Sequence, residues 1–233
     1  MDILITGASQ GIGFQLAFLL ASDPDNRVYA VARNRDKLEE LASKCRFRNL
    51  VPIAFSVDES IANSSVLPDL LKQYTDKIDL LVNNAGVLIN KPFAEISIAE
   101  AQKIFNTNYF AAAATIQAVI PMMGKNFRGH IVNISSMGGF QGSAKFPGLA
   151  HYSASKAAIA SLTECLAEEY KNANFSVNAL SLGSVQTEML ADAFPGYQAP
   201  VNAEEMASFI AWFATHGQHF FNGKILPVSV SVP

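Results

Sequence analysis

The sequence predicts a doubly wound α/β domain, in which helices cover both faces of a parallel β-sheet. Short β-branched runs alternate with longer helix-like segments from one end of the chain to the other. Those runs are apolar at nearly every position, as strands buried on both faces are. No low-complexity stretch or internal repeat divides the 233 residues, so we expect one domain over residues 1–233.

The apolar runs predict about seven strands, which are Ile3–Ile5, Val28–Ala32, Val51–Phe55, Asp79–Val82, His130–Ile134, Ser176–Leu180 and Ile225–Val228. The intervening segments predict six helices, which are Phe14–Ala21, Asp36–Ser43, Ile61–Tyr74, Ile98–Met123, Tyr152–Lys171 and Asn202–Ala214.

Two helix-like runs, Phe110–Met123 and Tyr152–Leu166, are alanine-rich or apolar around most of their circumference. Such a helix is usually buried on more than one side. Contact with a second subunit would bury these helices, so we expect a homodimer or homotetramer. Burial within the same domain is the alternative, and both stay open at this point.

The composition excludes several classes of partner. A net charge of −3, with Lys and Arg scattered, gives no reason to expect nucleic acid or an anionic membrane surface. No apolar stretch reaches the ~20 residues that a membrane span needs. With two cysteines and no secretory signal visible, we expect a cytoplasmic protein. The four histidines are dispersed, so we expect no metal site.

A glycine-rich turn, Thr6–Gly13, follows the first predicted strand and opens the first helix. There, free backbone N–H groups and the helix dipole meet ligand phosphates. Three spaced glycines alone are a weak signal, but between a strand and a helix they indicate a dinucleotide site.

The end of the second strand indicates which dinucleotide binds. It reads Val31-Ala-Arg-Asn-Arg35, with no carboxylate before Asp36 to hold a ribose 2′-hydroxyl. Arg33 can instead bind a 2′-phosphate through charge-assisted hydrogen bonds. We therefore favour NADP(H), with NAD(H) possible; the alternative is that Arg33 and Arg35 are ordinary solvated loop residues.

Tyr152 and Lys156 are four residues apart, so on a helix they lie on the same face. The ammonium is expected to lie beside the phenol and to lower the phenol pKa from its usual ~10. A tyrosine tuned in this way serves as a general acid or base.

Together, the glycine turn, Asn83–Gly86, Asn108, Ser136 and the Tyr152/Lys156 pair occur in an order that resembles the short-chain dehydrogenase/reductase family over essentially the full length. The resemblance implies a Rossmann fold and an NAD(P)-dependent oxidoreductase. It also implies a catalytic set in which Tyr152 is the acid/base and Lys156 tunes it. Ser136 would hold the substrate oxygen, with Ser135 the weaker candidate, and Asn108 would support a water-mediated proton relay.

The same resemblance implies the residues that contact the cofactor. They are Gly7, Ser9, Gln10 and Ile12 at the phosphates, Arg33 and Val57 at the adenosine, Asn84 near its ribose, Tyr152 and Lys156 at the nicotinamide ribose, and Val185 and Thr187 at the carboxamide.

Some positions depart from the family pattern. Ser56 stands where an aspartate commonly binds adenine, Leu182 replaces a proline, and Val230 with Ser231 replaces a glycine pair. Two segments are expected to border the substrate, the long loop Gly138–Leu149 and the lid-like segment Glu188–Ala199.

Two functions are therefore compared. The first is an NADP-dependent oxidoreductase that acts on a small-molecule ketone, aldehyde or 3-oxoacyl-type carbonyl, or on the corresponding alcohol. The second, suggested by the departures, is a dinucleotide-binding regulator or scaffold without turnover. A pure binder has no need for a tuned Tyr/Lys pair, which favours the enzyme.

Overall fold

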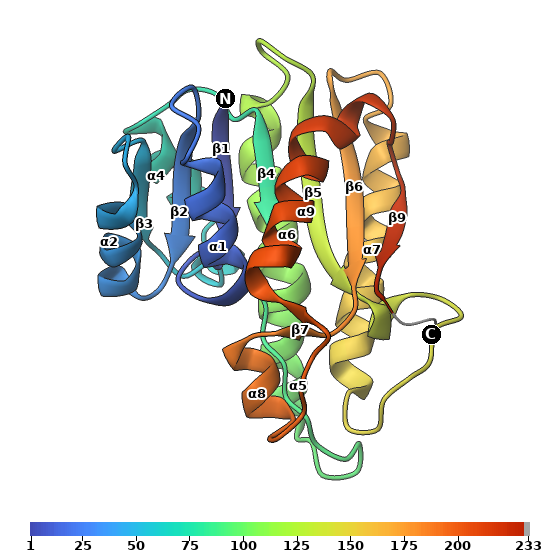
Figure 1. The fold of residues 1–233 in the computed structure, drawn as a ribbon. Coiled ribbons are helices and arrows are strands. Elements are labelled where there is room, and N and C mark those ends of the chain that lie inside the picture. The colour runs from blue at the N-terminus through green and yellow to red at the C-terminus, as the bar shows by residue number, and fades with distance from the viewer. Residues whose placement is uncertain (231–233) are drawn as a thin grey trace.

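A computed structural model describes residues 1–230, and Ser231 lies outside them. Seven parallel strands form one sheet in the order β3-β2-β1-β4-β5-β6-β9 (Figure 1). Their bounds are β1 Asp2–Thr6, β2 Arg27–Ala32, β3 Leu50–Ala54, β4 Leu80–Asn83, β5 Gly129–Ser136, β6 Phe175–Leu182 and β9 Ile225–Val228. The predicted doubly wound fold and its seven strands are confirmed.

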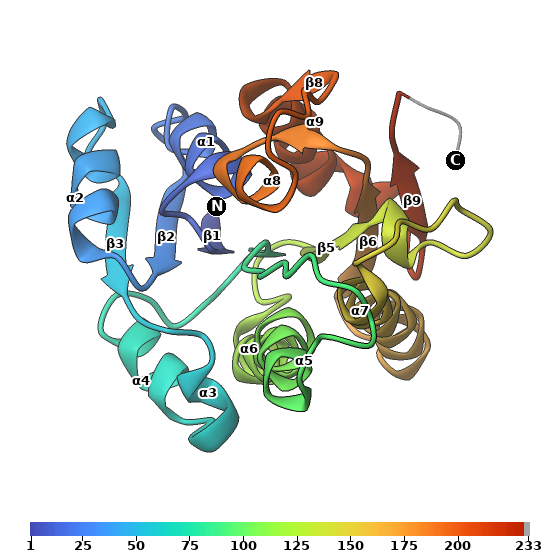
Figure 2. The same cartoon turned by 90° about the horizontal axis from the view of Figure 1, so that it is seen from below.

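Helices cover both faces of this sheet, as the seven apolar strands require (Figure 2). On one face lie α1 (Gly11–Leu20), α2 (Arg35–Lys44) and α9 (Ala203–His216). On the other lie α3 (Glu59–Ala62), α4 (Val66–Lys72), α5 (Ile98–Phe105), α6 (Ala111–Val119) and α7 (Ala150–Glu169). Each face has its own buried apolar cluster, so the two layers form one Rossmann-type α/β domain.

The strand order reverses at β1, which pairs with β2 on one side and β4 on the other. In open α/β sheets the crevice outside the carboxyl ends of the strands, at this reversal, is where ligands bind. The strands end toward the bottom of Figure 1, where α5 begins and α8 lies. The fold therefore places the site there.

Two predicted helices are interrupted. The segment Ile61–Tyr74 contains a turn between α3 and α4, where Asn63 Oδ1 accepts hydrogen bonds from the backbone and hydroxyl of Ser65. The segment Ile98–Met123 contains a π-helical turn, η1 (Asn106–Phe110), and ends in a 3₁₀ turn, η2 (Ile120–Met122), that includes Pro121.

The apolar circumference of the predicted helix Phe110–Met123 is explained largely within the chain. Seven of the nine residues of α6 are buried in the structure. Ile98 and Phe110, in the preceding turns, are 72% and 48% exposed. Burial within the domain thus accounts for the apolar residues of α6. A second subunit could still bury the exposed side chains of Ile98 and Phe110.

The lid-like segment is more ordered than a loop. It forms α8 (Glu188–Ala193), and the short strands β7 (Val185–Gln186) and β8 (Val201–Asn202) pair on either side of it. Short 3₁₀ turns also occur at Met137–Gly139 (η3) and Gly217–His219 (η4). Within residues 1–230 no helix is both long and apolar enough to span a membrane.

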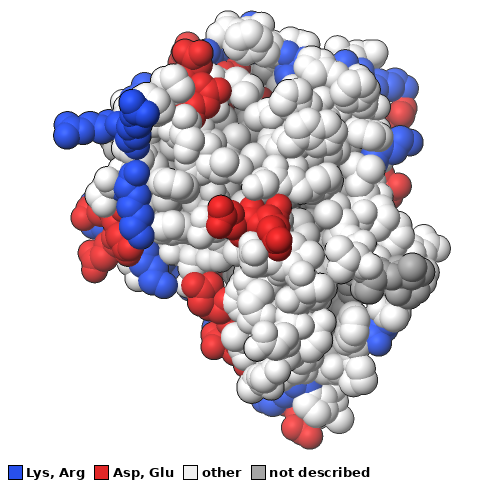
Figure 3. All heavy atoms as spheres, viewed as in Figure 1, with Lys and Arg blue, Asp and Glu red and all other residues white. Residues whose placement is uncertain are grey.

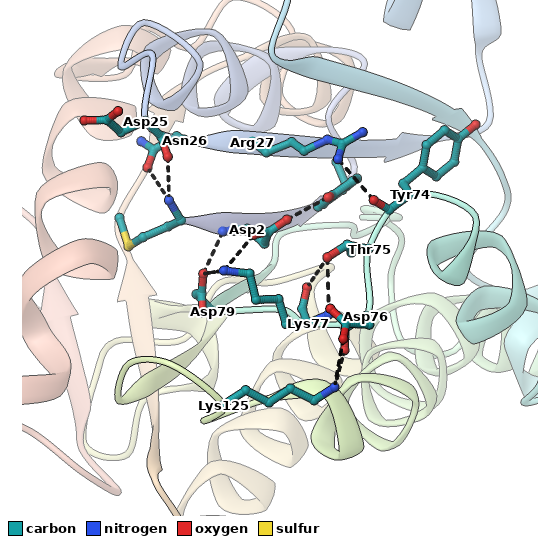
Figure 4. A network of polar contacts seen from close by, with 12 residues as sticks. Asp2, Asp25, Asn26, Arg27, Tyr74, Thr75, Asp76, Lys77, Asp79 and Lys125 are labelled. Carbon is teal, nitrogen blue, oxygen red and sulfur yellow. Dashed lines mark hydrogen bonds and ion pairs between the residues drawn. The ribbon is translucent and has the colours of Figure 1, made fainter.

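At the amino ends of β1 and β4, far from this crevice, a polar network fixes the strands (Figure 4). Asp2 donates its backbone N–H to Asp79 Oδ2 at 2.8 Å and accepts from the Tyr29 hydroxyl at 2.7 Å. Lys77 Nζ lies 3.3 Å from Asp2 Oδ2. Burial, with Asp2 adding to it, raises the pKa of Tyr29, so this phenol stays a neutral donor.

Candidate active site

A cavity of about 890 Å³ lies at the carboxyl ends of the strands. All eleven residues predicted to contact the cofactor line it, namely Gly7, Ser9, Gln10, Ile12, Arg33, Val57, Asn84, Tyr152, Lys156, Val185 and Thr187. Ser136 lines it as well, whereas Asn108 lies outside its wall. The fold thus brings residues from opposite ends of the chain around one space.

The turn between β1 and α1 can take only glycine at two positions. Gly7 has φ +70, and a Cβ there would lie 2.8 Å from Ala85 Cα. A Cβ at Gly13 would lie 2.3 Å from the Gly7 carbonyl oxygen. Asn84 Nδ2 donates to the carbonyls of Thr6 and Gly7, at 3.1 and 3.2 Å, and fixes the turn. Asn84, which was predicted to lie near the adenosine ribose, therefore also supports the phosphate turn.

The start of α1 fits a phosphate. Its first turn carries no acidic residue, and the N-cap residue Gln10 makes no capping hydrogen bond with its side chain. The first backbone N–H groups of a helix have no intrahelical acceptor and attract anions. Residues of this turn would hold the pyrophosphate of a dinucleotide.

The adenosine end carries two exposed cations. Arg33 follows β2 and forms no hydrogen bond or ion pair that the structure shows among residues 1–230. Lys37, one turn later, also lines the cavity and lies 3.4 Å from Gln10 Oε1 through its ammonium. No sequence motif predicts Lys37, which reaches the cavity only through the fold.

Tyr152 and Lys156 lie in the first half of α7, one turn apart as predicted. The Lys156 ammonium lies 5.9 Å from the centre of the Tyr152 ring and donates to the Ile134 carbonyl oxygen at 2.8 Å. Burial lowers the pKa of Lys156 to about 8. The lysine is 5% exposed.

The expected lowering of the Tyr152 pKa by this ammonium is wrong for this structure. Burial raises the pKa of Tyr152, and the neighbouring Ser136 side chain opposes the rise. The physical reason is that desolvation disfavours the phenolate, while the ammonium lies over the ring and bonds a backbone oxygen. The spacing placed the two groups correctly but did not reveal how deeply they are buried.

The two candidate serines at the end of β5 have different partners. Ser135 is buried and donates to the Lys156 carbonyl oxygen at 2.7 Å, which ties β5 to α7. Ser136 lies close enough to Tyr152 to oppose the rise in the pKa of its phenol, and its oxygen accepts from the Gly138 backbone at 3.1 Å. The geometry favours Ser136 over Ser135 as the residue that meets a substrate oxygen.

Asn108 lies in the π-helical turn η1 and is 2% exposed. Its Oδ1 accepts from Val87 N at 2.8 Å, and its Nδ2 donates to Val87 O and Ser155 Oγ, both at 3.0 Å. A Cβ built on Gly86 would lie 3.4 Å from Asn108 Oδ1 and 3.5 Å from Lys156 Nζ. Asn108 and Lys156 therefore both approach Gly86, and the part of Asn108 in a relay stays a prediction.

The segment after β6 is held by strand pairing and by α8. Leu182, which replaces the family proline, pairs with Val228 across β6 and β9. Thr187 caps α8 by accepting from Leu190 N at 3.3 Å. The hydroxyl hydrogen of Thr187 remains available to a ligand in the cavity.

Two loops and α8 close over the substrate end. Asn90 Nδ2 donates to the Ala193 carbonyl oxygen of α8 at 2.8 Å, and Lys91 N donates to Gly148 O at 3.0 Å. In the loop before α7, the Lys145 ammonium donates to the Gly138 and Phe140 carbonyl oxygens at 2.9 and 2.7 Å. The sequence does not predict these contacts, because each joins residues that lie far apart or in irregular backbone.

Between residues 1 and 230, no three His, Cys, Asp or Glu side chains come close enough to hold a metal ion.

The family model for short chain dehydrogenases matches residues 2–198 of the chain. This chain belongs to that family. Human retinol dehydrogenase 8 is 37% identical over 193 residues; the match covers 80% of this chain and 59% of the relative. The family predicted from the sequence is thus confirmed, although the chain spans less than two thirds of this relative's length.

Solved structures of the family resemble the whole chain. A 3-ketoacyl-(acyl-carrier-protein) reductase from Brucella melitensis, complexed with NADH, is 25% identical with a TM-score of 0.84; the match covers 98% of this chain and 96% of that one. ElxO with NADP bound gives the same identity, TM-score and coverage. Neighbours of this fold therefore bind either dinucleotide.

Proposed function

We propose that this protein is an NADP-dependent oxidoreductase that interconverts a small-molecule carbonyl compound and its alcohol, with Tyr152 as the general acid/base. The observation that carries the proposal is that Tyr152 and Ser136 line one cavity with the glycine turn, and that Ser136 lies close enough to Tyr152 to lower the pKa of its phenol. Two neighbouring hydroxyl groups can both reach a single oxygen atom of a substrate placed between them.

A bound nicotinamide supplies or accepts the hydride. In the reducing direction, Tyr152 donates a proton to the carbonyl oxygen and Ser136 stabilises the negative charge that develops there. Because burial raises its pKa, Tyr152 is protonated at neutral pH and ready to donate. The adjacent Lys156 ammonium stabilises the phenolate that remains.

The test is NADPH oxidation with a panel of ketones and aldehydes. We expect Tyr152→Phe to lower kcat at least about 100-fold, the range that a general acid contributes. Equal activity of wild type and variant on the best substrate would refute the assignment. Tight NADPH binding with no turnover by wild type would instead support the regulator.

The preference for NADP is supported by Arg33 and Lys37, two exposed cations at the end of the cavity that receives the adenosine. Arg33→Ala should raise the KM for NADPH about 10-fold or more and leave the KM for NADH nearly unchanged, since only the 2′-phosphate is lost as a partner. Arg46→Ala, which removes an exposed Arg outside the cavity wall, is the matched control. An unchanged NADPH/NADH ratio in Arg33→Ala would contradict the proposal.

We also propose that the chain self-associates in the cytoplasm. Ile98 and Phe110 on one face, and Trp212 and Phe220 near α9, are 72%, 48%, 54% and 75% exposed, more apolar surface than scattered residues explain. Both cysteines are free, which fits a reducing compartment. Sedimentation equilibrium should give a mass of at least a dimer, and a monomeric mass would contradict self-association.

A further inference from the structure

Charge is distributed unevenly along the cavity. The charged residues that line it are Arg33, Lys37, Asp58, Lys103, Lys156 and Glu188. Arg33 and Lys37 follow β2, at the adenosine end. Lys103 lies one turn before Thr107, whose hydroxyl donates to Asp58 at 3.1 Å, so this pair belongs to the same end.

The two remaining charged residues, Lys156 and Glu188, also lie away from the substrate end of the cavity or are held by other groups. Lys156 is held under Tyr152 by its hydrogen bond to Ile134. Glu188 Oε2 would lie 3.6 Å from a Cβ on Gly11, so its carboxylate faces the phosphate turn. Beyond Tyr152, therefore, no cation among the described residues lines the cavity.

The wall beyond Tyr152 is apolar. It is formed by two loops and by α8, with the side chains of Leu88, Met137, Leu149, Met189, Leu190 and Phe194. Phe146 and Tyr197 also line this end and are 54% and 49% exposed, which places them at its rim. The Tyr197 hydroxyl is already within hydrogen-bond distance of Ser184 Oγ, at 3.1 Å.

Cations near this end of the cavity already have partners. Lys145 donates to two carbonyl oxygens and to Ser143 Oγ, at 2.8 Å for the last. Lys91 lies 3.1 Å from Glu100 Oε1. On the face shown in Figure 3, acidic side chains lie over α8 and the start of α9. An anionic group on a substrate would therefore meet apolar walls without a cationic partner, at a large cost in free energy.

We propose that the substrate is an uncharged ketone, aldehyde or alcohol with a largely hydrocarbon body, not a carboxylate or a thioester on an anionic carrier. The inference rests on the proposed function, and it selects among the substrates which that function leaves open. In reduction, the carbonyl carbon gains a hydride from NADPH, which becomes NADP⁺, and the oxygen gains a proton from Tyr152. The hydrocarbon body lies against Leu149 and α8, inside the rim that Phe146 and Tyr197 form.

The test compares kcat/KM for three probes at pH 7: 2-decanone, 9-oxodecanoic acid of the same chain length, and acetoacetyl-CoA. The carboxylate of the acid in the apolar end, and the carrier phosphates of the thioester at its rim, would have no free cationic partner. We therefore expect 2-decanone to be preferred over the acid and the thioester by about 100-fold or more. Equal or higher kcat/KM for the acid or the thioester would overturn the inference and leave the proposed function standing.

A pair of variants tests whether the apolar wall, and not the overall charge of the protein, sets the ratio of kcat/KM between ketone and acid. Phe194→Lys places a cation at the apolar end, and should narrow the ratio between ketone and acid at least about 10-fold. Phe127→Lys adds the same charge at a 59% exposed position before β5, at the opposite end of the sheet, and should keep the wild-type ratio. An unchanged ratio in Phe194→Lys would also overturn the inference.

A binding measurement distinguishes failure of this inference from failure of the proposed function. Calorimetric titration of the protein in NADP⁺ compares 2-decanol with 9-hydroxydecanoic acid. If wild type reduces no probe, the proposed function has failed; tighter binding of the neutral alcohol still upholds the apolar site, and equal or tighter binding of the acid refutes it.

Discussion

The side-chain amide of Asn90 donates a 2.8 Å hydrogen bond to the carbonyl oxygen of Ala193, 103 residues later in the chain. It joins the loop after β4 to the last residue of α8 and so fastens α8 over the substrate end of the cavity. Asn90 is followed by Lys91, whose N–H bonds Gly148 in the loop before α7. Two adjacent residues thus connect three segments that the sequence leaves separate.

Removing the Asn90 amide should weaken closure of α8. We expect Asn90→Ala to raise the KM for the carbonyl substrate about 3- to 10-fold with a smaller change in kcat, because one net hydrogen bond contributes about 1 kcal/mol. Steady-state kinetics at saturating NADPH measures this. Asn63→Ala, which removes a local surface hydrogen bond near α4, is the control. A KM equal to that of wild type would show that the bond does not hold α8 closed.

The Lys145 ammonium holds the loop that carries Met137 and Phe146. Lys145→Met should lower kcat/KM about 10-fold, since hydrogen bonds to the Gly138 and Phe140 carbonyl oxygens are lost next to Ser136. Lys145→Arg, which keeps a charged donor, should restore part of the activity. Lys125→Met removes a lysine that bonds Asp76 far from the cavity and should behave as wild type. If Met and Arg at position 145 gave the same loss, the donor role would be wrong.

The local sequence pattern predicted the strands well because each strand is apolar by itself. The last strand, Ile225–Val228, agrees residue for residue. The local sequence pattern failed where contacts between distant residues determine the backbone conformation. The π-helical turn at Asn108 depends on bonds to Val87 and Ser155, 21 and 47 residues away. The sequence therefore predicted one helix over Ile98–Met123, and the structure interrupts it.

In the candidate active site, too, the sequence predicted the local features and not those that depend on distant contacts. Spacing predicted that Tyr152 and Lys156 share a helix face, and motif order predicted the residues around the cavity. The sign of the Tyr152 pKa shift was wrong because it depends on burial by residues from several elements. Lys37, Lys145 and Asn90 lie in no motif, so only their three-dimensional neighbours reveal them.

The burial of Lys156 predicts a pH limit on reduction. Its pKa of about 8 means that the ammonium is present below that pH and lost above it. Since the charged form stabilises the Tyr152 phenolate, kcat/KM for the carbonyl should fall as pH rises through about 8. The profile of the residual activity of Lys156→Met should lack this limb. A wild-type kcat/KM that stayed level up to pH 9.5 would contradict the assignment.

His130 predicts a loss of stability in acid. Its ring is 1% exposed, with Nδ1 2.9 Å from the Ala214 carbonyl oxygen and Nε2 3.0 Å from Asn178 Nδ2, and burial lowers its pKa from 6.5 to about 4. The Ala214 carbonyl requires a proton on Nδ1, so Nε2 accepts and the folded protein holds the neutral ring. Below pH 6.5 the unfolded chain takes up a proton that the folded chain excludes, so stability falls as pH drops toward 4.

The loss in the free energy of unfolding that we expect from His130 is about 2 kcal/mol between pH 7 and pH 5. Urea unfolding at both pH values measures it. His130→Gln should be less stable at pH 7 but lose less on acidification, whereas His216→Gln, at an exposed position, should follow wild type. A loss in His130→Gln as large as that of wild type would assign the acid sensitivity to other groups.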